Sequence, residues 1–564
     1  MVNFDLARDG TLSHYSVPMA RHLNFCSLAF HALIGGVIWA MAFHLPAALK
    51  LPALFTDNRV LQRDQPDFVW GWDDPGTSVE VAIAGQTKTS KADASGKWSV
   101  QLDALKASSA PLTMSVKGSS AVEIRNILVG EVWMCSGQSN MAFPLGDADN
   151  AELEVAGMKH SGIRLITVPN LGTQEPQKDF TGAWAVCTPE TAKDFSAIGL
   201  YYGRYLHEIL GVPVGLICNA WGGSYIEAWL PRPVLEHDPH FAEIMEQVVK
   251  AEGRATSPKS IARYEQQVAD WEKEAAEAEK QNLPRPKHPR DPRDFMPGNQ
   301  RVGNIYNGVL FPTIGYGIKG VIWYQGEANT ADAKVYELMF PLLIKQWRKD
   351  WNRDELPFYW VQLPNHGART TELVDGLWPA LRDAQTKATK LPHTGQAVTV
   401  DIGDGNSLHP KNKLDVAARL ARWALAKDYG MDMPCRSPLP IEVTLKAEGK
   451  IALRFDSVGR GLVTRQSDSV TGFALCGADK KWHWAHGDIV DYNLVEVSSE
   501  AVPKPIAIRY CWTDNPECNL FTREGLPATP FRTDDFELVL PEKPAPAPPP
   551  PAASNGAAPA PAPK

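Results

Sequence analysis

The amino-acid sequence predicts an α/β protein built on a parallel sheet. Between residues 126 and 430, apolar runs of strand length alternate with amphipathic helical patterns. Such alternation indicates parallel strands whose helices cover both faces of the sheet. The segments on either side, 50–125 and 436–540, consist of short strand patterns separated by turn residues. We therefore expect an α/β domain flanked by an N-terminal β-sandwich domain and a C-terminal β-rich domain.

Each expected element rests on its own pattern. Ser196 precedes a helical face that ends at Gly211, as a capped helix requires. Residues 239–298 interrupt the alternation and combine a charged helical stretch with a Pro- and Arg-rich segment, which predicts a helical insertion. Strands are expected at 68–72, 79–83, 96–102, 127–134, 163–168, 214–218, 320–324, 358–363 and 397–401, and helices at 341–350, 379–389 and 414–427.

The two ends of the chain have compositions that differ from the folded part. Arg21 precedes an apolar run from 25 to 43, and Ala40-Met41-Ala42 has the form of a signal-peptidase site. Residues 1–45 are therefore expected to be a signal peptide. Translation from Met19 instead of Met1 would give a signal peptide of more ordinary length. The alternative is an uncleaved membrane anchor, because the apolar run is long enough to span a membrane. Either one predicts a secreted or periplasmic protein. Residues 541–564 are almost only Pro and Ala, which predicts a disordered tail.

Composition narrows the function classes. A net charge of −8 and a pI near 6.0 argue against nucleic acid as a partner. No spacing of Cys and His suggests a metal site, so no metal is expected. Cys511 and Cys518 can close a small loop, whereas Cys135 and Cys218 lie in apolar strands and are expected to be buried thiols.

One polar turn has the form of a nucleophile site. The apolar run 127–134 is followed by Ser136-Gly-Gln-Ser-Asn140. Gly137 permits a sharp turn, and a serine at the carboxyl end of a parallel strand lies where such sheets bind ligands. Ser139 is therefore a candidate nucleophile. The alternative is that this segment only caps a helix, because Ser and Asn favour caps.

Three further polar turns follow strands of the same region: Gly222-Gly223, 325–329 and 404–409. Because turns at the carboxyl ends of parallel strands converge, their residues are expected to meet Ser139. His409 can take the proton of Ser139 and return it. The backbone N–H groups of Ser139 and Gly223 and the side-chain amide of Asn329 can donate to an oxyanion.

Four blocks in this order carry a family resemblance. They are G-Q-S-N-M at 137–141, W-G-G-S-Y-I-E-A-W at 221–229, W-Y-Q-G-E-A-N at 323–329, and His409-Pro410. Together they resemble the sialate O-acetylesterase-like branch of the SGNH hydrolases, over about residues 51–535. The resemblance implies a three-layer, flavodoxin-like fold and a serine esterase that removes acetyl groups from sugars without a cofactor. It also implies Ser139 as nucleophile, Gly223 and Asn329 as oxyanion donors and His409 as base.

The chain departs from the family pattern at the third member of the triad. Many SGNH enzymes have an Asp three residues before the catalytic His, and this chain has Asn406 there. Asp404 is our candidate for the carboxylate, with Asp401 or a backbone carbonyl as alternatives. Asp404 equally fits a turn-shaping role.

The remaining site candidates are substrate contacts. We assign this role to Gln138, Gly222, Gln325 and His366, and His366 is also a rival base because it follows a strand of the same sheet. Gln325 alternatively satisfies buried polar groups.

The sequence thus predicts a secreted serine O-acetylesterase whose partner is an acetylated sugar or polysaccharide. One alternative is an acetylesterase acting on plant cell-wall polysaccharides such as xylan or xyloglucan. The other is a non-catalytic carbohydrate-binding protein in which the serine turn is inert.

Overall fold

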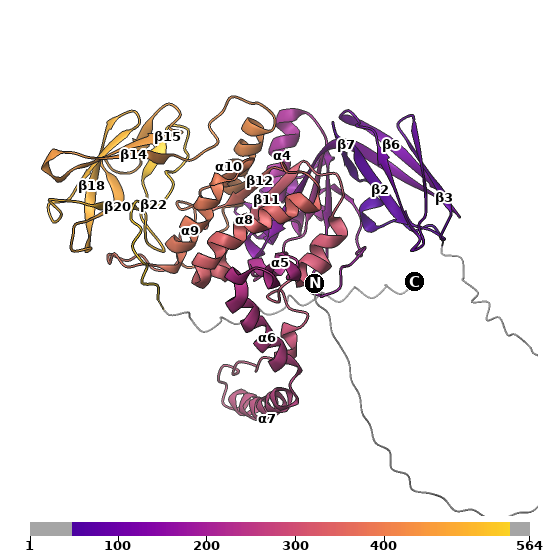
Figure 1. The fold of residues 1–564 in the computed structure, drawn as a ribbon, viewed down its shortest axis with the longest axis horizontal. Coiled ribbons are helices and arrows are strands. Elements are labelled where there is room, and N and C mark those ends of the chain that lie inside the picture. The colour runs from indigo at the N-terminus through magenta and orange to yellow at the C-terminus, as the bar shows by residue number, and fades with distance from the viewer. Residues whose placement is uncertain (1–47, 542–564) are drawn as a thin grey trace, which may run out of the picture. The chain divides into compact units, whose positions relative to one another are not determined.

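The computed structural model describes residues 48–541 of the 564-residue chain (Figure 1). The predicted leader at 1–45 and the tail beyond residue 541 lie outside these residues. Within 48–541, no helix combines the length and the apolar character needed to cross a membrane.

A parallel sheet forms the centre of the fold, as predicted. The neighbouring strands run in the order β13-β12-β11-β7-β10-β8, all parallel, with β9 antiparallel at the edge beside β8. These strands are β7 (Ala121–Gly137), β8 (His160–Thr167), β9 (Ala185–Cys187), β10 (Val214–Cys218), β11 (Gly320–Tyr324), β12 (Phe358–Val361) and β13 (Thr394–Ala397).

Helices cover this sheet. The strands β10, β11 and β12 are buried along their whole length, which requires cover on both faces. The helix α4 (Ala197–Leu210) packs against α10 (Lys413–Lys427), and α8 (Ala333–Asp350) packs against α9 (Leu377–Lys387) (Figure 1). Shorter helices are α1 (Ser139–Ala142), α2 (Ala151–Gly157), α3 (Pro189–Lys193) and α5 (Arg232–Glu236).

The predicted caps of α4 are confirmed. The hydroxyl of Ser196 accepts a hydrogen bond from the backbone N–H of Gly199 at 3.0 Å, and Gly211 ends the helix in the left-handed conformation with φ of 65°.

One predicted strand and one predicted helix were placed wrongly, and the strand expected at 127–134 is longer, running over Ala121–Gly137. The strand expected at 397–401 lies earlier, as β13 (Thr394–Ala397). After Ala397, side-chain hydrogen bonds hold the chain in place of backbone hydrogen bonds between strands. The hydroxyl of Thr399 donates to the carbonyl oxygen of Gln362 at 2.6 Å. The helix expected from residue 341 begins at Ala333, and Pro341 lies inside it.

The N-terminal strands share β7 with the central sheet. They are β1 (Val60–Gln62), β2 (Asp67–Trp72), β3 (Ser78–Ile83), β4 (Gln86–Lys91), β5 (Lys97–Leu102) and β6 (Ser108–Lys117). The first part of β7 pairs with β6, and the second part pairs with β10 and β11. The domain boundary expected at 125/126 therefore falls inside one strand. Asn126, with φ of 55°, marks an irregularity there.

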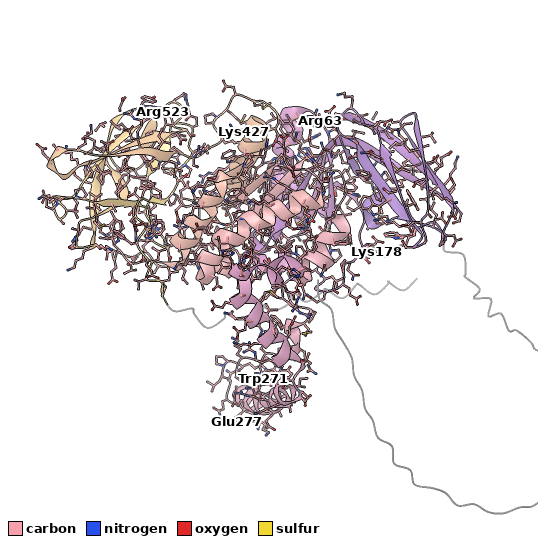
Figure 2. All side chains as sticks on the ribbon, viewed as in Figure 1. Arg63, Lys178, Trp271, Glu277, Lys427 and Arg523 are labelled. Carbon is pink, nitrogen blue, oxygen red and sulfur yellow. A yellow bond between two sulfur atoms is a disulfide. The ribbon has the colours of Figure 1, made fainter. Side chains whose placement is uncertain are left out.

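The insertion at 239–298 contains a helical hairpin, as predicted. It consists of α6 (Ala242–Thr256) and α7 (Pro258–Lys280). Figure 2 labels Trp271 and Glu277 on α7. The indole N–H of Trp271 donates to the carbonyl oxygen of Pro286 at 2.8 Å, so the Pro-rich segment folds back onto α7.

The C-terminal region is β-rich, as predicted. One antiparallel sheet has the order β14-β15-β19-β18-β17-β20-β22, and its apolar residues form a separate hydrophobic core. The strands are β14 (Leu439–Leu445), β15 (Ile451–Asp456), β17 (Val470–Cys476), β18 (Trp482–Asp491), β19 (Leu494–Ser498), β20 (Ala507–Tyr510) and β22 (Phe531–Arg532), with β16 (Leu462–Thr464) and β21 (Leu520–Thr522) pairing apart. Cys511 and Cys518 form the expected disulfide, and Cys135 and Cys218 are buried thiols.

Candidate active site

The order of the strands predicts a crevice at one position along the carboxyl edge of the sheet. The chain first builds β8 and β10 on one side of β7, and then β11, β12 and β13 on the other. The carboxyl end of β7 is thus flanked by those of β10 and β11, at the position where strand order reverses. Open α/β sheets bind ligands at such a point. Ser139, the first residue of α1, follows β7 there.

The turn that carries Ser139 is fixed by its neighbours. Gly137 has φ of 128°, and a Cβ atom at this position would collide with the carbonyl oxygen of Tyr324. Only glycine therefore fits. The N–H of Gln138 donates to that carbonyl at 2.8 Å, and the N–H of Trp221 donates to the carbonyl of Gly137 at 2.9 Å. Hydrogen bonds to both flanking strand ends hold the serine in place.

His409 reaches Ser139 from the loop between β13 and α10. Its Nε2 lies 2.8 Å from the hydroxyl oxygen of Ser139. Burial lowers the pKa of the His409 imidazole, and the positive charges of Lys413 and His366 lower it further. The neutral imidazole is therefore favoured, and in that form Nε2 can accept the serine proton.

Asp404 lies on the same loop but its carboxylate faces the turn. It accepts a hydrogen bond from the N–H of Asn406 at 2.8 Å. Asp401 is held by Arg419 through two contacts of 2.6 and 2.7 Å. Between residues 48 and 541, the carboxylates make no hydrogen bond to Nδ1 of His409. The geometry therefore matches the turn-shaping alternative for Asp404, and Asp401 serves an ion pair.

His366 is near the pair without joining it. Its Nδ1 lies 3.3 Å from the carbonyl oxygen of Asp404, and its ring packs edge-on against Trp378 at 5.1 Å. Because the hydroxyl of Ser139 bonds to His409, the rival base is not in position to take its proton.

The glycine turn after β10 lies directly against the serine. A Cβ atom on Gly222 would lie 3.3 Å from the Cβ of Ser139. Gly223 has φ of 71°. The side-chain amide of Asn299 donates to the carbonyl of Gly222 at 2.5 Å. The expected approach of this turn to Ser139 is therefore present.

The side-chain amide of Asn329 is held in one orientation. Its oxygen accepts from the N–H of Ile226 at 3.0 Å and from Nε2 of Gln325 at 2.8 Å. Its Nδ2 donates to Glu227 at 3.0 Å. An amide nitrogen has two hydrogens, so this bond leaves one N–H for another acceptor.

The two glutamines assigned to substrate both bridge loops. Nε2 of Gln325 also donates to the carbonyl of Ser224 at 3.0 Å, and the side-chain oxygen of Gln138 accepts from the N–H of Gly326 at 3.3 Å. These contacts fit the alternative in which Gln325 satisfies buried polar groups.

A buried polar network beneath the pair was missed from the sequence. Nδ2 of Asn140 donates to Glu327 at 2.5 Å and to the carbonyl oxygen of Leu408 at 3.0 Å. Nζ of Lys413 donates to the side-chain oxygen of Asn140 at 2.6 Å. The network connects the residue after Ser139 to the residue before His409, and so holds the two loops together.

Burial sets the charges in this network. Lys413 is 1% exposed, and burial lowers its pKa to about 7, while Glu327 partly offsets that effect. Burial also raises the pKa of the Glu327 carboxyl. The available signal was positional: Asn140 follows Ser139 directly, and Lys413 is the first residue of the helix after His409. Within 48–541, His, Cys, Asp and Glu form no group of three or more that can hold a metal ion.

Comparisons with known proteins point to one family. A family model described as a carbohydrate esterase, sialic acid-specific acetylesterase, matches residues 305–425. The crystal structure of a carbohydrate acetylesterase from Xanthomonas citri is 36% identical, with a TM-score of 0.72, and the match covers 87% of this chain and 100% of that one. The sialate O-acetylesterase of Mus musculus is 28% identical over 528 residues, covering 85% of this chain and 93% of that protein. The human sialate O-acetylesterase is 27% identical over 528 residues, covering 86% and 92%.

The match to the Xanthomonas citri structure extends over most of this chain and all of that one, with more than one third of the residues identical. The family model covers β11, β12, β13 and the loop of His409. The chain belongs to the sialate O-acetylesterase-like family of carbohydrate acetylesterases.

Proposed function

We propose that this protein is a serine esterase that removes O-acetyl groups from carbohydrates. The observation that carries the proposal is the 2.8 Å contact between Nε2 of His409 and the hydroxyl of Ser139 at the reversal point of the sheet. A nucleophile, its base and a close glycine turn are the parts that acyl transfer needs. The family relationship supplies the class of substrate.

In the first half of the reaction, the oxygen of Ser139 attacks the carbonyl carbon of the ester and its proton passes to His409. The negative oxygen of the tetrahedral intermediate accepts hydrogen bonds from the N–H groups of Ser139 and Gly223 and from the free N–H of Asn329. His409 then gives the proton to the departing sugar oxygen, and an acetyl group remains on Ser139.

In the second half, water replaces the sugar. His409 removes a proton from a water molecule, and the resulting hydroxide attacks the acetyl carbon. The intermediate collapses, acetate leaves, and the proton returns to the oxygen of Ser139. We propose that His409 and Ser139 act as a pair, while Asp404 maintains the turn and His366 contacts the substrate.

The proposal also covers the fold family of the central domain, the export of the protein and its substrate. The reversal of strand order at β7 and the two packed helix pairs support a three-layer, flavodoxin-like SGNH arrangement. The apolar run at 25–43 and the disulfide between Cys511 and Cys518 support export through a signal peptide. The proposed substrate is an O-acetylated sialic acid.

Release of acetate is the direct test. The purified protein and Ser139→Ala are each incubated with O-acetylated sialic acid and with acetylated xylan. We expect acetate from the sialic acid with the intact protein and almost none with the variant. Release of acetate from xylan alone would show that the substrate is a plant polysaccharide. If the folded protein releases acetate from neither compound, the proposal is contradicted.

A further inference from the structure

Among residues 48–541, the buried arginines have an acid or backbone carbonyls as electrostatic partners, with one exception. Arg419 is paired with Asp401, and Arg509 with Asp375 and Asp534. Arg348 and Arg382 donate to backbone carbonyls. Nε and Nη1 of Arg59 have no hydrogen-bond partner, but its guanidinium lies over the ring of Phe55 and the carboxylate of Asp67 is nearby. This is the pattern expected when burial of a guanidinium must be compensated.

Arg164 is the exception. It lies in β8 and is 3% exposed. Its Nε and Nη1 have no hydrogen-bond partner, and Nη2 makes one long contact of 3.4 Å to the side-chain oxygen of Asn126. Burial lowers the pKa of Arg164, and no nearby acid opposes that effect. The positive charge of Arg164 is therefore buried without a counter-charge from the described part of the chain.

A cavity of about 360 Å³ lies beside this arginine. Its described lining residues include neither Asp nor Glu. The lining is completed by Ser109, Pro111, Asn126, Leu128, Ser161, Gly162, Val186 and His207. Ser109 and Ser161 are exposed and supply hydroxyl donors near the opening, while Arg164 lies at the buried end.

The chemistry of this lining favours an anion. Water can fill the space and accept hydrogen bonds, but it leaves the buried guanidinium without a negative charge. An oxyanion supplies that charge and can accept a hydrogen bond from Nη2, whose one contact is the long one to Asn126, and such charge-assisted bonds are stronger than neutral ones. Serine hydroxyls add donors to the same ligand.

We propose that this cavity is a binding site for a small oxyanion, such as phosphate, sulfate or a carboxylate, held by Arg164 in preference to chloride. The site is separate from the catalytic turn. Arg164 is level with Gly215 near the start of β10, whereas Ser139 follows the carboxyl end of β7. The lining comes from β6, β7, β8, β9 and α4, so a bound anion joins the N-terminal strands to the central sheet.

Thermal unfolding of the full chain tests the site without depending on esterase activity. Sodium chloride is replaced stepwise by sodium phosphate at constant ionic strength, and parallel series use sulfate and acetate to separate tetrahedral anions from carboxylates. A ligand that binds only the folded state raises Tm, so we expect a saturable rise of about 2 °C or more with at least one of them. Arg164→Met should lose the rise. Arg125→Met, which changes an exposed arginine of β7 outside the cavity, should keep it.

A second variant covers the case in which Arg164→Met does not fold. Ser161→Glu places a carboxylate at the exposed opening and should abolish the rise by competing for Arg164. The proposal is overturned if the unmodified protein shows no saturable rise with any of the three anions. It is equally overturned if Arg164→Met or Ser161→Glu responds as the unmodified protein does.

Discussion

Nε2 of His409 lies 2.8 Å from the hydroxyl oxygen of Ser139, although 270 positions separate the two residues in the chain. The parallel sheet produces this contact, because β7 and β13 both present their carboxyl ends to the same edge. No carboxylate of residues 48–541 makes a hydrogen bond to Nδ1 of His409. This arrangement agrees with the proposal that Ser139 and His409 act as a pair while Asp404 maintains the turn.

Substitution at Asp404 separates a catalytic pair from a triad. We expect Asp404→Asn to keep kcat within a few-fold of the original value, because an asparagine oxygen still accepts from the N–H of Asn406. His409→Ala should lose several orders of magnitude. Steady-state hydrolysis of p-nitrophenyl acetate measures both. A loss of about 10⁴ in Asp404→Asn, as for a triad aspartate, would show that the carboxylate acts on the imidazole.

The glycine turn can be tested with matched backbone strain. Gly223 and Gly211 both have positive φ, of 71° and 65°. Alanine in this conformation costs about 1–2 kcal/mol, so Gly223→Ala and Gly211→Ala should be destabilised alike. Only Gly223→Ala should lower kcat, by distorting the proposed oxyanion donor. Denaturant unfolding and ester hydrolysis are measured side by side, and equal activity of the two variants would remove Gly223 from the site.

Asn329 is predicted to act on the transition state. Removal of one oxyanion donor costs about 10²–10³ in kcat, and we expect Asn329→Ala to fall in this range with little change in KM. Glu227→Gln is the control, since a glutamine oxygen can still accept from Nδ2 of Asn329. Full activity of Asn329→Ala, or an equal loss in Glu227→Gln, argues that the amide only supports the loop.

Lys413 should set the pH dependence through His409. The charge of Lys413 is one cause of the lowered pKa of the imidazole. Lys413→Met removes that charge, so the pKa of His409 should rise and the acidic limb of kcat/KM should move to higher pH. Lys411→Met, at an exposed position beside it, is the control. A Lys413→Met profile that coincides with the original, or that moves to lower pH, contradicts this account.

Much of the fold could be predicted because its elements are marked locally. The uninterrupted apolar runs of β10 and β11 and the caps of α4 are encoded in adjacent residues. The start of α8 was misplaced because proline is common at the first turn of a helix, whereas Pro341 lies inside this one. A domain boundary was predicted at 125/126, although β7 continues through this point. The strand pattern is irregular there, and such an irregularity resembles a boundary in the sequence.

Part of the candidate site could likewise be predicted from the sequence, and part could not. Ser139 and His409 could be proposed from motifs at strand ends, but the partners of Asp404 depend on how a loop turns, which sequence spacing does not specify. The link from Lys413 through Asn140 to Glu327 is formed by three side chains from distant segments. A buried lysine reads from sequence as an exposed one, so its role became visible only from its burial.

Hydrolysis of p-nitrophenyl acetate by Ser139→Ala tests the central claim most directly. Ser136→Ala is the matched control. Ser136 precedes Ser139 by three positions, and its hydroxyl is buried and has no hydrogen-bond partner. We predict a loss of several orders of magnitude in kcat for Ser139→Ala and near-normal activity for Ser136→Ala. Activity in Ser139→Ala that equals the original, or its absence in the folded unmodified protein, would contradict Ser139 as the nucleophile.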